Sequence, residues 1–113
     1  MKMTWEDAQR TCEQTPESYL VTIEGKMEDE FLLATMRSLS ARQFWIGLND
    51  REKESLHEWL DGTEEVYRNL ILSSDNKEKV LDCVMSKKHS WYTQECGKKA
   101  AFVCEYRPCK FMF

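Results

Sequence analysis

The chain of 113 residues has little of several features that mark large classes of protein. It contains 4 glycines and 2 prolines, which excludes collagen-like and low-complexity chains. No apolar run approaches the ~20 residues of a membrane-spanning helix. The 16 Lys and Arg residues are outnumbered by 20 Asp and Glu, and the net charge of −4 argues against a general binder of nucleic acid or membrane surfaces. The composition that remains is that of one globular domain with a thin core.

Signatures of catalysis and secretion are also missing. There is no glycine-rich phosphate loop, and no two cysteines have the CxxC spacing of a zinc ribbon or a thioredoxin-like centre. The two histidines, His57 and His89, stand apart in the sequence, so we predict no enzyme. Residues 1–6 turn acidic without an apolar stretch and are not a signal peptide. The chain is therefore either cytosolic or a piece of something longer.

Two helices are predicted in the first third of the chain. Thr4 can cap the first helix, which places Trp5, Ala8 and Cys12 on one face and stops before Pro16. Residues 26–39 form the second helix, and the acidic residues 28–30 are interpreted as solvated charges in its first turns, where the helix dipole favours them. The apolar face of this helix is expected to contain Met27, Phe31, Ala34 and Leu39, widened by Leu32 and Leu33.

Short strands and turns follow. The long stretch 68–81 has no clear period and is predicted to be a loop. The order of helix, helix and then strands predicts the α+β class. The expected strands are residues 20–23, 44–48, 57–60, 66–67, 82–85, 90–92 and 101–106.

Several motifs in one order over residues 4–106 resemble the C-type lectin-like domain. Trp45-Ile46-Gly47-Leu48 matches the WIGL motif of that family. The resemblance implies an α+β fold with two helices, small antiparallel sheets and a long irregular loop, over residues 4–106, followed by a tail at 107–113. The other matching segments are Thr4-Trp5 with Ala8 and Cys12, Leu20-Val21-Thr22-Ile23, Glu30-Phe31-Leu32, Trp59 with Asp61-Gly62, Cys83-Val84-Met85, Trp91 with Cys96, and Phe102-Val103-Cys104-Glu105.

The five cysteines cannot be paired from spacing alone. The resemblance implies that Cys12 pairs with Cys104 and Cys83 with Cys96, each bridge adding ~2–4 kcal/mol. Such bridges imply an extracellular setting, in a secreted protein or the ectodomain of a membrane protein. The alternative is a set of reduced cytosolic cysteines. Cys109 has no partner, which leaves open a free thiol, a disulfide-linked partner chain or an accident of the sequence end.

The start of the chain departs from the family. Members usually carry a strand before the first helix, whereas only three residues precede Thr4 here. We therefore expect an unpaired edge on the strand 101–106, and edges of this kind attract other chains. A fragment of a longer protein, or a truncated gene model, is the preferred explanation. Residues 109–113 are a tail or, less favoured, a replacement edge strand.

Calcium-dependent sugar binding is not expected. Sugar-binding members place Asn and Asp after the tryptophan that corresponds to Trp91, but this chain has Tyr92 and Thr93 there. The triplet of the long loop is replaced by Ser74-Asp75-Asn76, which lacks the proline. We predict no cofactor, with calcium as the minor alternative. Weak candidate ligands for an atypical calcium site are Asp75, Asn76, Glu78, Asp82 and Glu95, whose preferred interpretation is a solvated loop face.

The remaining signal is a pair of lysine turns, Lys87-Lys88 and Gly97-Lys98-Lys99. They belong to residues 66–113, which carry a net charge of +4 against −8 for residues 1–65. Whether the two turns lie together or at opposite ends stays open. The predicted function is extracellular recognition of a protein or receptor ligand without calcium. The alternatives are glycan binding, either without calcium or through an atypical calcium site, and a truncated chain with no stable function alone. The candidate ligand-binding residues are Lys87, Lys88, Tyr92, Lys98 and Lys99.

Overall fold

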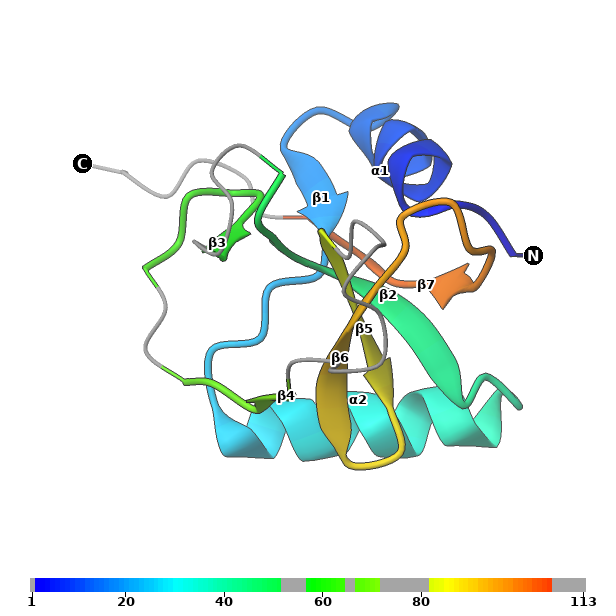
Figure 1. The fold of residues 1–113 in the computed structure, drawn as a ribbon, viewed down its shortest axis with the longest axis vertical. Helices are drawn as coiled ribbons and strands as arrows, with labels where there is room; N and C mark the ends of the chain where they lie inside the picture. Colours follow the sequence, from blue (N-terminus) through cyan, green and yellow to red (C-terminus); the bar gives the residue numbers. More distant parts are fainter. Residues whose placement is uncertain (1, 52–56, 65–66, 72–81, 107–113) are drawn as a thin grey trace.

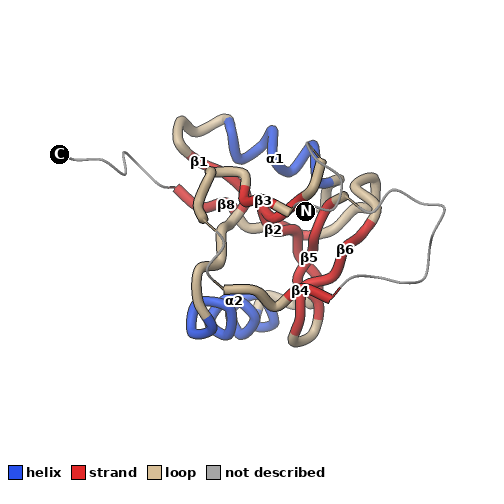
Figure 2. The backbone as a smooth tube through the Cα atoms, turned by 60° about the vertical axis from the view of Figure 1, so that its left-hand side comes forward, coloured by secondary structure: helices blue, strands red, loops and turns tan. Residues whose placement is uncertain are grey.

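A computed structural model describes residues 2–51, 57–64, 67–71 and 82–106 of the chain. Helices α1 (Trp5–Glu13) and α2 (Lys26–Ser38) lie on opposite sides of the strands (Figures 1 and 2). This arrangement confirms the predicted α+β class with two helices and small sheets. The strands are β1 (Ser18–Leu20), β2 (Gln43–Asn49), β3 (Glu58–Trp59), β4 (Leu70–Ile71), β5 (Cys83–Lys87), β6 (Ser90–Gln94), β7 (Ala101–Phe102) and β8 (Cys104–Tyr106).

Helix α1 begins where the sequence predicts. The amide of Asp7 donates to Thr4 Oγ1 at 3.2 Å, which satisfies one of the free amides of the first turn. Trp5, Ala8 and Cys12 are buried on one face, as predicted.

Helix α2 ends one residue before the predicted end at residue 39, and of its predicted apolar face only Leu32 and Leu33 pack against the core. Met27 is 85% exposed and Phe31 is 68% exposed, and Leu39, just beyond the helix, is also exposed. The buried residues are Asp29 and Met36, and Leu32 and Leu33 pack against the core between them. Because these four share the spacing i, i+3, i+4 and i+7, they form an equally good helical face. The helix turns this face inward because hydrogen-bond donors of the core meet the Asp29 carboxylate.

The strands form a mixed sheet in the order β3-β2-β5-β6-β4, with β7 beside β2, and a separate pair of β1 and β8. Most pairs are antiparallel, but β7 runs parallel to β2 and β4 runs parallel to β6. Strand β4 lies inside the stretch 68–81, for which the sequence predicts a loop. The strand predicted at 20–23 is displaced, since β1 ends at Leu20. Residues 66 and 72–81 lie outside the described residues.

The predicted single strand 101–106 is wrong, because the chain changes partner at Val103. Strand β7 pairs with β2, whereas β8 pairs with β1, where Leu20 faces Cys104. Strand β8, where an unpaired edge was expected, therefore pairs with β1 along one of its two edges. Among the described residues no strand lies along its other side.

The core consists of two clusters of buried side chains, and all four tryptophans belong to them. Trp45 and Trp91 are fully buried, so their rings serve to pack the core. The Trp5 indole donates to the carbonyl of Ile46 at 3.0 Å, and the Trp45 indole donates to that of Met3 at 2.9 Å. These bonds satisfy polar atoms that would otherwise be costly to bury.

Both disulfides that the resemblance implies are present. Cys12–Cys104 joins α1 to β8 across 92 residues of sequence, with a Cα–Cα distance of 5.4 Å. Cys83–Cys96 joins the start of β5 to the loop after β6, with a Cα–Cα distance of 5.2 Å. Cys109 and the proposed tail at 107–113 lie outside the described residues, so the domain boundary at 106 stays a prediction.

Candidate functional site

The register of the strands gathers basic residues at the start of β2. Arg42 directly precedes β2, whose first residue, Gln43, faces Lys87 on β5. On the other side of β2, Phe44 faces Ala101 on β7. The turn between β5 and β6 and the loop before β7 therefore flank Arg42 from opposite sides. The two lysine turns, whose proximity the sequence left open, are neighbours of one strand end.

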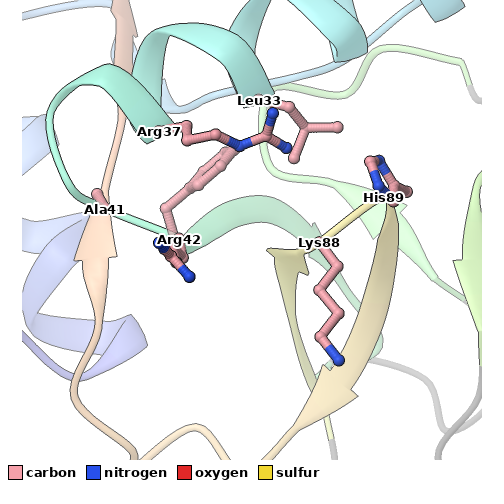
Figure 3. A pocket seen from close by; sticks show the side chains of 7 residues that line it. Leu33, Arg37, Ala41, Arg42, Lys88 and His89 are labelled. Atoms are coloured by element: carbon pink, nitrogen blue, oxygen red, sulfur yellow. The ribbon is translucent and has the colours of Figure 1, made fainter.

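A first cleft of about 310 Å³ lies between α2 and the β5–β6 turn. Figure 3 shows Arg37 reaching from α2 on one side of the cleft and His89 on the other. Lys88 extends from the same turn on the side away from α2. The lining residues are Leu33, Arg37, Ala41, Arg42, Phe44, Lys88 and His89.

A second cleft of about 430 Å³ adjoins the first, because Ala41 and Arg42 line both. Its basic side chains come from the start of the chain, from Arg42 and from the loop before β7. We call the basic residues of the two clefts the basic surface: Lys2, Arg37, Arg42, Lys88, His89, Lys98 and Lys99.

The charge of the basic surface is not neutralised by the described part of the chain. Among the described residues, no carboxylate lines either cleft. On α1, by contrast, Arg10 pairs with Glu6 and Asp7, and Arg51 reaches Glu6 at 3.2 Å. All seven residues of the basic surface are exposed, and in the described ranges none of them takes part in an ion pair within 4.0 Å. The arrangement can therefore attract anionic groups, although the whole chain is acidic.

The structure brings together some of the predicted ligand-binding residues and not others. Lys88, Lys98 and Lys99 belong to the basic surface. Lys87 is half-buried at the end of β5 and lines neither cleft. Tyr92 is half-buried in the middle of β6, between β5 and β4, and also lines neither cleft.

Sequence reasoning missed four members of the basic surface, namely Lys2, Arg37, Arg42 and His89. In the sequence, Arg37 has the pattern of a helix-end charge and His89 that of an ordinary turn residue. The sequence offered one clue, the position of Arg42 directly before the WIGL strand. Any strand that pairs with the start of the WIGL strand must have one of its own ends near Arg42.

The weak calcium candidates are only partly described. Asp75, Asn76 and Glu78 lie outside the described residues. Cys83 faces Gln94, so Asp82 and Glu95 lie at the same end of the β5–β6 pair, and both are half-buried. Within the described ranges no group of three or more His, Cys, Asp or Glu residues is placed to hold a metal ion.

Asp29 is a second site that the sequence did not reveal. Its side chain is only 2% exposed, and its Oδ1 accepts from the Trp91 indole at 3.1 Å. Its Oδ2 accepts from the Tyr67 hydroxyl at 3.0 Å and from the Asn69 amide at 3.1 Å. Burial, followed by the hydrogen bond to Asp29, raises the pKa of Tyr67 above its ordinary value. This cluster connects α2 to the stretch before β4 and to β6, and it is a structural centre of the fold.

Two helices on opposite sides of the strands, with disulfides Cys12–Cys104 and Cys83–Cys96, define a small domain of the lectin-like fold. The family model described as "Lectin C-type domain" matches residues 1–106, and the chain belongs to this family, whose members are generally not enzymes.

Its relatives include one of the subunits of Snaclec salmorin from Gloydius brevicauda, which is 36% identical over 92% of this chain and 71% of its own length. Snaclec coagulation factor X-activating enzyme light chain 2 of Daboia siamensis is 33% identical over 93% of this chain and 70% of its own. The crystal structure of human lithostathine matches with a TM-score of 0.82 over 94% of this chain and 78% of its own, and at 23% identity it shows the fold alone.

Proposed function

We propose that this domain is a non-enzymatic extracellular recognition module that binds a protein or receptor ligand without calcium. The observation that carries the proposal is the composition of β6 after Trp91. Thr93 is buried, and Tyr92 is half-buried between two partner strands. Neither side chain offers the carboxylate or amide oxygens that calcium prefers. The strand from which sugar-binding members take calcium ligands is instead committed to packing.

Several features support a protein ligand. Relatives are named as subunits or as the light chain of an activating enzyme, so they act within protein assemblies. Helix α2 exposes Met27 and Phe31, and large apolar side chains of these types are enriched in protein interfaces. The two disulfides support an oxidising, extracellular location. Within the described residues, no helix has the length and apolar character to cross a bilayer.

The test combines calorimetric titration of calcium with binding assays in calcium and in chelator. The chain is applied to a panel of purified extracellular proteins and to a glycan array. We expect no heat of calcium binding, and protein binding that the chelator leaves unchanged. Phe31→Ser should weaken that binding, whereas Glu30→Ser, at an exposed position next to it, should not. Glycan binding that the chelator abolishes would overturn the proposal.

Glycan binding through an atypical calcium site is the second candidate. Its support is the position of Asp82 and Glu95 at one end of the β5–β6 pair. Two carboxylates supply only part of the six to eight oxygens that calcium takes. A calcium signal lost in both Asp82→Asn and Glu95→Gln would favour this candidate over the first.

A further inference from the structure

We infer that the basic surface binds a sulfated glycan chain, without calcium and separately from the protein recognition proposed above. The inference starts from continuity. The clefts of about 310 and 430 Å³ share Arg42, so one extended ligand can occupy both. Each cleft alone is in the range of a small-ligand site, which begins at roughly 300 Å³. A chain of linked sugar rings fits this layout better than a single small anion.

The side chains suit sulfate groups in particular. Arg42 at the junction and Arg37 on α2 carry planar guanidinium groups, which can donate two parallel hydrogen bonds to one oxyanion. Lys98 and Lys99 supply point charges on flexible stems at the far end. A ligand with negative groups at repeated intervals can meet arginine in the first cleft and at the junction, and lysine in the second cleft.

An acidic protein face is a poorer match for the same surface. The cores of protein interfaces are depleted in lysine and enriched in Tyr, Trp, Phe and Met. Of the residues that the structure describes, Phe44 is the one aromatic side chain, other than His89, that lines either cleft, and it is fully buried. The remaining apolar lining consists of leucine and alanine. Such a surface provides charge and few anchors, so its ligand must supply a high density of negative groups.

The acidic remainder of the chain sets the expected strength of binding. The net charge of −4 repels a polyanion at long range, so binding depends on attraction by the nearby basic side chains. Salt screens this attraction beyond about 8 Å at physiological ionic strength. Binding should therefore be strongest at low salt. If three or four sulfates are contacted, the logarithm of the affinity should fall with the logarithm of salt with a slope of roughly −2 to −4, by analogy with phosphate contacts.

The experiment measures affinity for a size-defined heparin oligosaccharide at low salt in the presence of chelator. Arg42→Gln should weaken binding about tenfold, because one charged partner at the junction is lost. Arg42→Lys keeps the charge and should weaken binding less. Lys26→Gln is the matched control, since Lys26 is exposed on α2, lines neither cleft and carries the same charge. Its affinity should change less than twofold.

Specificity is tested with hyaluronan, which carries carboxylates without sulfates, and with polyglutamate as an acidic polypeptide. Both should bind at least tenfold more weakly than the heparin oligosaccharide. No heparin binding at low salt, equal loss in Arg42→Gln and Lys26→Gln, or equal affinity for the three polymers would each overturn the inference. Because protein binding is scored separately with the Phe31→Ser variant, failure here leaves the proposed function standing, and the reverse also holds.

Discussion

The buried carboxylate of Asp29 gives the sharpest test of how the fold is held together. Replacement by alanine removes the acceptor of three hydrogen bonds. The donors Tyr67 and Asn69 are half-buried and can turn to water. The Trp91 indole cannot, because its side chain is fully buried. Asp29→Ala therefore leaves at least one buried donor unsatisfied.

The magnitude follows from those three bonds. An orphaned buried donor costs about 1–3 kcal/mol, and each bond to a charged group contributes about 1.5–3 kcal/mol. Removing a buried charge offsets part of this loss. We expect Asp29→Ala to lower the free energy of unfolding by about 2–4 kcal/mol. Asp29→Asn keeps an acceptor for Trp91 and presents an N–H group to the Tyr67 oxygen. The Asn69 amide loses one acceptor but keeps the His89 carbonyl, so the change should cost only about 1 kcal/mol.

Urea denaturation, followed by tryptophan fluorescence with the disulfides intact, measures these differences. Glu30→Ala is the control, because Glu30 is exposed on the same helix and should change stability by no more than about 0.5 kcal/mol. If the alanine and asparagine variants were equally stable, or if Asp29→Ala matched the control, the hydrogen-bond reasoning would be refuted.

Three further predictions concern pH, the disulfides and a close backbone contact. The pKa of Tyr67 is raised in the folded state, so its stabilising contribution is present below pH 10 and is lost as pH rises through the folded-state pKa. Tyr67→Phe should therefore reduce the loss of stability at alkaline pH, measured by denaturation. Loss of Cys12–Cys104, which spans 92 residues, should cost about 4–5 kcal/mol, whereas loss of Cys83–Cys96, which spans 13, should cost about 3 kcal/mol. Unfolding of the two paired Cys→Ala variants measures both costs, and the reverse order would contradict this prediction. Gly47→Ala should destabilise by roughly 1–3 kcal/mol in the same assay, because its Cβ would lie 2.8 Å from the Leu20 carbonyl oxygen, which is backbone and has little freedom to move away.

Elements with strong local signals were predictable from the sequence. Helix α1 has a capping residue and a single apolar face, and the WIGL strand is a short apolar run that is fully buried. Each needs no knowledge of distant residues. The disulfides came from the family resemblance, since spacing alone allows several pairings.

Elements that depend on partners were not predictable. Strand β4 has two residues and forms only because β6 lies beside it, which a periodicity argument cannot detect. The inward face of α2 was misjudged because Asp29 is acidic, and acidic residues are seldom buried unless paired. Its partners Tyr67, Asn69 and Trp91 lie 38 to 62 residues away in sequence.

The basic surface shows the same limit from the side of function. Along the sequence, the first 65 residues carry a net charge of −8, which suggests that positive charge belongs to the second part alone. In space, Arg37 and Arg42 from that acidic part join Lys88 and Lys99 from the basic part. What joins them is the pairing of β2 with β5 on one side and with β7 on the other. The strand that forms the buried centre of the sheet therefore also positions the surface charges, so a change of register in β2 would disperse the binding surface while leaving the composition unaltered.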